Sequence, residues 1–168
     1  MTAIFVPDAH ARASIAAIRS LGRAGYTVHA GSEHPDALGL KSRFANHATL
    51  HPAYHDTQFI TWMRAYVARH GIRMIVPSAG VLRALEPVFE EFSHLLPVTS
   101  DREVLYGCLS KCTVVRRFQD ADPALGLMDH HPASVVVDLD QPVGADQLPP
   151  SETGYFIKAE GHRGAGPG

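Results

Sequence analysis

The residues best suited to chemistry lie near the carboxyl end of the sequence, where a lysine precedes a glycine-rich run. Lys158 is followed by Gly161, Gly164 and Gly166 in the spacing G-x-x-G-x-G. A lysine ammonium is a compact charge suited to a phosphate, and glycine backbone can fold its N–H groups over phosphate oxygens. The run is not a Walker A loop, because no G-K-[S/T] follows the glycines. It indicates phosphate binding, with a flexible linker as the alternative.

A second position for chemistry is the turn after the first predicted strand. Ligands gather at the carboxyl ends of parallel strands, so His10 in this turn and Ser78 after a later strand are candidate substrate-edge residues. The turn contains no G-x-G-x-x-G run, and its side chains would crowd a pyrophosphate, which argues against NAD binding. Ordinary connecting turns are the alternative interpretation of both positions.

The cysteines and histidines give little support for a metal site. Cys108 and Cys112 are the two cysteines, and their spacing would suit a metal or redox pair on one helix face. A zinc site needs four ligands, however, and no second pair exists. The eleven histidines are spread along the chain without the helix or strand spacing of a ligand pair. We therefore expect partly buried thiols, ordinary surface or core histidines, and no metal site.

The elements that must position these residues alternate between strand and helix over the first hundred residues. Gly25 and Gly71 stand where helices should end, and a helix with an apolar stripe predicts that Trp62 lies on its buried side. The alternation predicts a Rossmann-like α/β domain over residues 1–108, with helices on both faces of a doubly wound parallel sheet of four or five strands. The predicted strands are 2–6, 26–30, 47–51, 72–76 and 95–98.

The pattern changes after about Leu109. One more helix is predicted around Val114, Val115 and Phe118. Two strand-like runs follow, S-V-V-V-D-L at 134–139 and Y-F-I-K-A at 155–159, separated by a proline-rich loop. We predict that residues 109–168 form a second, incomplete α+β subdomain.

Composition excludes several classes of function. The formal net charge of −2 gives no reason to expect nucleic acid or a membrane surface as partner. No apolar run approaches the ~18–20 residues that span a bilayer, and the first residues lack the basic region of a signal peptide. We therefore expect a cytoplasmic protein, and the sequence leaves a homodimer open.

Several segments, in order along the chain, resemble the ATP-grasp family of ligases. The helix and strand at 18–29 resemble those of the domain that precedes the ATP-binding part, and I-R-M-I-V-P-S at 72–78 resembles its next strand. L-S-K at 109–111 resembles the start of the lysine helix that opens the ATP-grasp domain. The run at 155–159 resembles the second lysine strand, and 161–166 resembles the loop that covers the phosphates.

The resemblance implies an ATP-dependent carboxylate–amine or carboxylate–thiol ligase that acts through an acyl phosphate, with ATP and Mg²⁺ as cofactors and a small-molecule carboxylate as substrate. Lys111 and Lys158 would reach the ATP phosphates. In the family, the Mg²⁺ ligands come later in the chain, so we expect the front part of a ligase that is inactive alone and binds ATP weakly. The residues implied for the flap over the phosphates are Glu160, Gly161, Arg163, Gly164 and Gly166.

The alternative is a non-catalytic Rossmann-like module that holds a small metabolite or a protein partner. The two hypotheses differ in what they expect of the apolar run Val135–Val137. An incomplete ligase subdomain should leave these side chains exposed, whereas a complete module should bury them.

Overall fold

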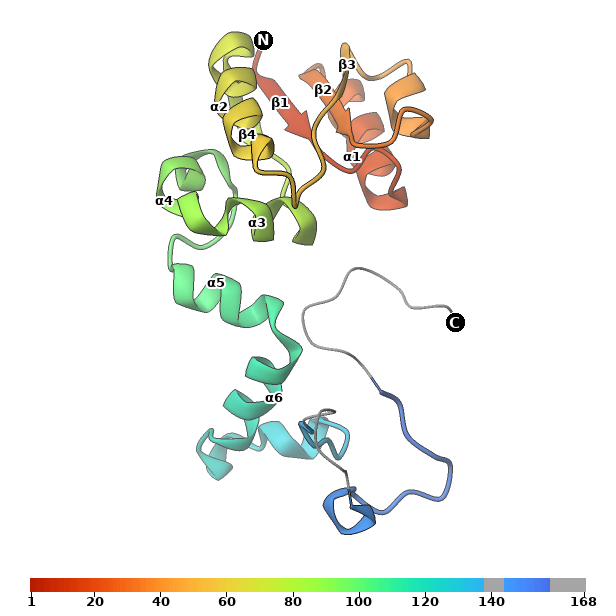
Figure 1. Ribbon diagram of the computed structural model, residues 1–168, viewed down its shortest axis with the longest axis vertical. Helices are drawn as coiled ribbons and strands as arrows, with labels where there is room; N and C mark the ends of the chain where they lie inside the picture. The colour runs from red at the N-terminus through yellow and green to blue at the C-terminus, as the bar shows by residue number, and fades with distance from the viewer. Residues whose placement is uncertain (138–143, 158–168) are drawn as a thin grey trace. The chain divides into compact units, whose positions relative to one another are not determined.

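The computed structural model describes residues 1–137 and 144–157 and divides the chain into two units, Met1–Arg102 and Glu103–Gly168 (Figure 1). The strands of the described residues all lie in the first unit, with helices packed on both sides of them. The predicted α/β class, a Rossmann-like parallel sheet flanked by helices, is confirmed for this unit. No helix in the described part of the chain is long and apolar enough to cross a membrane.

The sheet of the first unit has the strand order β3-β2-β1-β4, and every neighbouring pair is parallel. Strand β1 therefore lies in the interior, with β2 on one side and β4 on the other. The strands are β1 (Ala3–Val6), β2 (Thr27–Ser32), β3 (His47–Leu50) and β4 (Ile72–Ile75). The α-helices that connect or follow them are α1 (Arg12–Arg23), α2 (Gln58–His70), α3 (Ala79–Leu85) and α4 (Phe89–Phe92).

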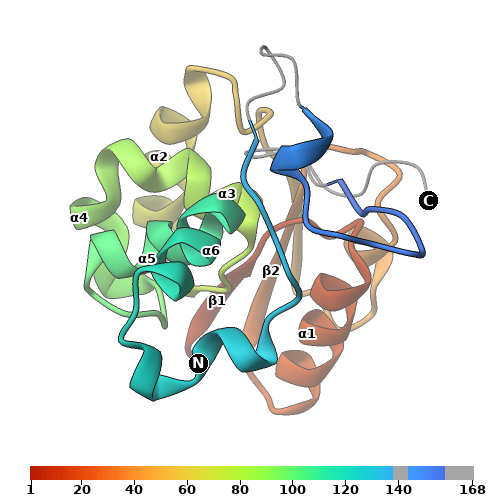
Figure 2. The ribbon, with the colours of Figure 1, turned by 90° about the horizontal axis from the view of Figure 1, so that it is seen from below.

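The two crossover helices cover opposite faces of the sheet, because successive side chains of a strand point to opposite faces. Ile4 packs in one buried cluster with Ile18 of α1. Its neighbour Phe5 instead contacts Trp62 and Tyr66 of α2, with ring centroids 6.0 and 5.6 Å away. Figure 2 shows α1 and α2 on either side of β1 and β2. Trp62 is half-buried on the inward side of its helix, as predicted.

Local signals fix the ends of the helices. Gly71 ends α2 in the left-handed conformation with φ 59°, which glycine adopts without strain. At the other end of α2, the Asp56 side chain accepts a hydrogen bond from Gln58 N at 2.8 Å. Helix α3 ends just before Pro87, which stands in a short 3-10 turn, because proline cannot continue a helix past its first turn.

The fifth predicted strand of the first unit, 95–98, is wrong. Ser93–Leu95 forms a 3-10 turn, and Val98 N bonds to Leu96 O at 2.8 Å rather than to a strand. Leu95 and Leu96 are nevertheless buried. The apolar run correctly indicated burial, but burial alone does not determine whether a short segment pairs with a sheet.

The second unit is made of short helices. Helix α6 carries Val114, Val115 and Phe118, so the additional helix is confirmed. The predicted strands fail over their described parts, since 134–137 and 155–157 form no strand. Strands need a neighbour to satisfy their backbone groups, and these segments have none in the described part of the unit. The elements are α5 (Arg102–Leu109), α6 (Lys111–Gln119) and 3-10 turns at Pro123–Leu125, Leu127–His130 and Ala145–Gln147.

Candidate functional site

The carboxyl edge of the sheet is the first candidate site, because the strand order places a switch point between β1 and β4. The chain leaves β1 toward β2 and β3 and then returns through α2 to β4 on the other side. In open α/β sheets, ligands bind in the crevice outside such a point. His10 follows β1 and Ser78 follows β4, so both predicted substrate-edge residues lie at this edge.

Tyr54 connects the two loops that flank the switch point. Its hydroxyl donates a hydrogen bond to Asp8 Oδ1 at 2.7 Å, and it also hydrogen-bonds with the Ser78 side chain. The Tyr54 ring packs so closely on Gly80 that a Cβ there would lie 2.6 Å from a ring carbon. Burial, followed by the charge of Asp8, raises the pKa of Tyr54 above its ordinary value. Tyr54 therefore stays a neutral donor that holds the Asp8 carboxylate in place.

Asp8 has an unusual backbone conformation for its position. Its φ of 54° lies in the left-handed region, which non-glycine residues seldom adopt and which aspartate tolerates better than most. Such conformations cost roughly 1–3 kcal/mol and gather at binding and catalytic sites. With Oδ1 held by Tyr54, the other carboxylate oxygen makes no hydrogen bond within the described residues. Asp8 is thus a positioned acceptor at the edge of the sheet.

His10 has partners of its own and does not contact Ser78. Its Nδ1 lies 3.4 Å from the Ser32 hydroxyl at the end of β2, and its ring meets the ring of His34 edge-on at 4.8 Å. Ser32 is fully buried and also accepts a hydrogen bond from His34 N at 3.0 Å. The structure therefore brings His10 to Ser32 of β2, whereas Tyr54 joins Ser78 to Asp8.

His51, directly after β3, adds a buried acceptor to the same edge. Its Nδ1 bonds to Pro52 O at 2.8 Å, which leaves Nε2 as the unprotonated nitrogen of the neutral ring. Nε2 is buried and has no hydrogen-bond partner among the described residues. Burial lowers the pKa of His51, although the nearby charges of Asp8 and Glu33 oppose this. Together with Asp8, this nitrogen suits a ligand that donates hydrogen bonds.

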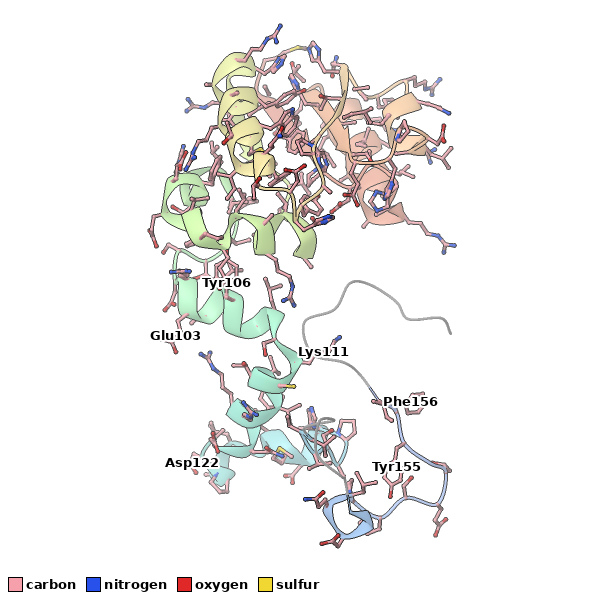
Figure 3. All side chains as sticks on the ribbon, in the orientation of Figure 1. Glu103, Tyr106, Lys111, Asp122, Tyr155 and Phe156 are labelled. Carbon is pink, nitrogen blue, oxygen red and sulfur yellow. The ribbon has the colours of Figure 1, made fainter. Side chains whose placement is uncertain are left out.

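The second candidate site surrounds Lys111 in the second unit. Ser110 caps helix α6, since its hydroxyl accepts a hydrogen bond from Thr113 N at 3.0 Å, and Lys111 is the first residue of the helix. The Lys111 side chain lines a cavity of about 790 Å³. Figure 3 labels Lys111 at the start of α6 and Tyr155 and Phe156 on the segment that forms another wall.

The described residues that line this cavity include no acidic side chain. Pro149 O accepts a hydrogen bond from the Tyr155 hydroxyl at 2.8 Å, which ties the carboxyl-terminal wall together. Lys111 is the one lysine or arginine on the lining, and the volume falls within the ~300–1,000 Å³ of small-molecule sites. Charge and size therefore suit an anionic ligand. The polar and aromatic lining residues beside Lys111 are Cys108, His131, Ser134, Ser151, Tyr155 and Phe156.

The remaining residues predicted to bind ATP lie outside the described residues. These are Lys158, Glu160, Gly161, Arg163, Gly164 and Gly166. Lys111 is the described member of this set, and its role in ATP binding stays a prediction.

The described residues contain no group of three or more His, Cys, Asp or Glu side chains that could hold a metal ion. Cys108 and Cys112 form no disulfide with each other; Cys108 is exposed and Cys112 is half-buried. The scan against protein-family models found no match, and neither did the search of curated proteins.

Sequence reasoning missed Asp8, Tyr54 and His51 as residues of the carboxyl edge. A signal for Asp8 was available, because it comes two residues after a buried strand and is therefore closer to the strand end than His10. Tyr54 lies in the loop between β3 and α2, and only the three-dimensional fold carries it across to Asp8, 46 residues earlier in the chain.

Proposed function

We propose that this chain forms the front part of an ATP-grasp ligase that joins a small-molecule carboxylate to an amine or a thiol through an acyl phosphate. The observation that carries the proposal is the position of Lys111. This lysine begins a serine-capped helix, as the family resemblance of L-S-K at 109–111 implies, and it lines a cavity whose described lining has no acidic side chain. The parallel sheet of the first unit supports the same proposal, because the resemblance implies a Rossmann-like domain there.

The physical role of Lys111 follows from its charge. When a phosphoryl group passes from ATP to a carboxylate, negative charge on the transferring oxygens must be stabilised, and a fixed ammonium does this without reorganising. ATP supplies the phosphoryl group. No cluster of carboxylates that fits Mg²⁺ occurs within residues 1–137 and 144–157. The charge that this chain contributes is thus Lys111 and, by resemblance, Lys158.

The exposure of apolar side chains in the second unit favours the ligase over a complete binding module. Val135 is 43% exposed and Phe156 is fully exposed, and Val136 and Val137 are only half-buried. A self-sufficient module would bury such residues. In the proposed ligase, further strands of the ATP-grasp subdomain cover them.

The carboxyl edge of the first unit is the proposed place for the carboxylate substrate, with His10 and Ser78 on its two sides. His10 can offer a donor to the carboxylate of this substrate. Asp8 and His51 Nε2 at the same edge are acceptors, so a donor group elsewhere on the substrate would face them. We place the enzyme in the cytoplasm and leave a homodimer open.

The test begins with the DNA that follows the codon for Gly168. We expect an open frame with an acidic segment that can hold Mg²⁺, and the protein expressed from the whole frame should release ADP only when a carboxylate and an amine or thiol are supplied. Replacing Lys111 or Lys158 by Met should lower turnover roughly a hundredfold, as expected for the loss of one preorganised charge. Lys41→Met is the matched control, because Lys41 is an exposed lysine of the first unit.

Two results would overturn the proposal: a downstream sequence without such a frame, or Lys111→Met turnover equal to that of Lys41→Met. Calorimetry of the 168-residue chain with ATP and Mg²⁺ adds a separate check. We expect weak binding or none, since closing a glycine loop costs roughly 1–2 kcal/mol per ordered residue. An exposed lysine contributes little binding free energy to offset this cost. Low-micromolar binding would contradict an incomplete site.

A further inference from the structure

A second cavity, in the first unit and separate from the cavity at Lys111, lies on the face of the sheet covered by α2. Three histidines meet there from three elements. His29 of β2 is paired in register with His47 of β3, and His70 ends α2. The ring centroids of His29 and His47 are 4.3 Å apart, and His70 lies 5.1 Å from His29 and 5.9 Å from His47. We call these residues, with Arg69, the basic cluster.

Aromatic side chains adjoin the basic cluster along α2. Tyr66 stacks on Trp62 with centroids 4.8 Å apart, and His70 lies 4.3 Å from the Tyr66 ring. The Tyr66 hydroxyl is 3.0 Å from His29 Nδ1 and also hydrogen-bonds with Thr49. These contacts fix the aromatic rings beside the histidines.

No acidic side chain balances the basic cluster. Arg69 is exposed and forms no ion pair within the described part of the chain. Burial first, and then the charges of His47 and His70, lower the pKa of His29 to about 4. The pKa of His70 is lowered by burial, Arg69 and His47. The groups that act on these histidines are therefore all basic.

The carbonyl end of α2 compensates part of this charge. A helix carries the equivalent of roughly half a negative charge at its last turn, which explains why Arg69 and His70 are tolerated there. This partial charge is smaller than the full charge of Arg69, so the helix end leaves the basic cluster with a net positive charge. An anion from outside the chain would supply the missing charge.

The cluster and the rings together line a cavity of about 380 Å³, which is large enough for a single-ring ligand. We propose that this cavity binds a small planar aromatic anion, a carboxylate or phosphate carried on one ring, with the anion at Arg69 and His70 and the ring against Trp62 and Tyr66. An arginine guanidinium suits both oxyanions because its planar fork can donate two hydrogen bonds. The lining residues are His47, Ala48, Thr49, Trp62, Ala65, Tyr66, Arg69 and His70.

Binding should depend on pH. The titratable and charged groups that line the cavity are His47 from β3 and Tyr66, Arg69 and His70 from α2. His29 of β2 is buried behind them, against His47 and His70. The pKa of His70 is lowered by burial and by its basic neighbours, and a bound anion favours its charged form. Binding therefore takes up a proton at His70 and should tighten as the pH falls from about 8 to about 6. Arg69 stays charged throughout this range.

The test uses Trp62, the single tryptophan of the chain, as a reporter in the cavity wall. Phenyl phosphate and benzoate are titrated into the whole chain while tryptophan fluorescence is followed. Benzamide, which keeps the ring and lacks the charge, and inorganic phosphate, which keeps the charge and lacks the ring, are the comparison probes. We expect saturable binding of phenyl phosphate or benzoate, at least about tenfold tighter than either comparison probe. Equal binding of benzamide or of inorganic phosphate, or no saturable change with any probe, overturns the proposal.

Variants locate the bound anion. Arg69→Gln should weaken binding of the preferred anion at least about tenfold, because a charge-assisted hydrogen bond is lost. Arg19→Gln is the matched control, since Arg19 is an exposed arginine on α1, which covers the other face of the sheet. His70→Gln should remove most of the pH dependence. Arg69 and His70 both lie in the last turn of α2. Circular dichroism checks that the variants remain folded. Equal affinity of the Arg69 and Arg19 variants also overturns the proposal.

Discussion

The two units of the chain differ most in what they bury. In the first unit, side chains from both faces of the sheet and from the helices are removed from solvent, and Phe5, Ile18, Phe59 and Phe89 are 0–2% exposed. In the described part of the second unit, Leu105 is the one buried apolar side chain, while Tyr155, Phe156 and Ile157 are exposed. The first unit thus has a buried core, whereas the described helices of the second unit enclose none.

This difference follows from how the two regions satisfy their backbone. Parallel strands give each other hydrogen bonds and present two apolar faces that helices must cover. The second unit has two short helices, and helices of this length are marginal in water without packing. Its contacts are local, such as the ring of Phe118 against His131 with centroids 5.6 Å apart. The comparison teaches that paired strands give the first unit a buried core, whereas the short helices described in the second unit bury little apolar surface.

The largest expected effect is on core phenylalanines. Phe5→Ala removes a ring that is fully buried between the sheet and α2, and it should lower the free energy of unfolding by about 3–5 kcal/mol. Phe118→Ala, in half-buried Phe118 of the second unit, should cost below about 1 kcal/mol. Urea unfolding followed by Trp62 fluorescence measures the loss in the first unit, and hydrogen exchange of α6 measures the loss in the second. Equal losses would show that the second unit has a core of similar quality.

A matched pair of tyrosine hydroxyls provides the second test. Tyr54→Phe removes a hydrogen bond to the Asp8 carboxylate at the carboxyl edge and should cost about 1.5–3 kcal/mol, because the acceptor is charged. Tyr155→Phe removes a hydrogen bond to Pro149 O on a half-exposed ring, where water replaces it, and should cost near zero. Thermal unfolding of both variants measures the two losses of stability. A Tyr54→Phe protein as stable as the parent would mean that Tyr54 does not hold Asp8.

The third test is the pH dependence of the first unit. The pKa of His29 is lowered to about 4, mainly by burial and then by His47 and His70, from an ordinary value of 6.5. Because the folded value lies below the unfolded value, this contribution to stability is complete above about pH 6.5. It is lost as the pH falls toward about 4, by roughly 1–2 kcal/mol after allowance for solvent screening.

His29→Gln should flatten this pH dependence, since glutamine keeps a polar contact for Tyr66 and does not titrate. His94→Gln is the control, because His94 is an exposed histidine of the same unit. Denaturant midpoints measured from about pH 7 to about pH 4 compare the variants. If the His29 variant and the parent lose stability in parallel, the histidines of the basic cluster are not the cause.

The strand–helix alternation of the first unit could be predicted from sequence because each signal is local. Apolar runs such as Ile72–Ile75, an apolar stripe on α2 and the glycine at 71 each act within a few residues. The strands expected at 134–139 and 155–159 could not be judged this way. Their β-branched and aromatic residues indicate a strand only when a partner strand is at hand, and partners are a property of the whole fold.

The candidate sites were predicted only in part for the same reason. Ser110 and Lys111 form a local capping pattern, and the structure places them at the start of a helix as expected. The clustering of His29, His47 and His70 depends on strand register and on where α2 ends. Residues 18 and 41 positions apart in the chain carry no mutual spacing signal, so counting histidines along the sequence suggested only a scattered set.

The smallest expected effect comes from removing one serine helix cap in each unit. The same change is then compared between the two units. Ser78 Oγ accepts from Val81 N at 3.2 Å at the start of α3, and Ser110 Oγ accepts from Thr113 N at 3.0 Å at the start of α6. Replacing either serine by alanine removes one such hydrogen bond, which is worth about 1 kcal/mol.

In the first unit, α3 is packed through buried Val81, Leu82 and Leu85, so the loss should appear in global unfolding. In the second unit, α6 has no buried residue, so the same loss should appear as faster hydrogen exchange confined to α6, with the Trp62 transition unchanged. A shift of the Trp62 transition by Ser110→Ala as large as that by Ser78→Ala would show that the two units unfold as one.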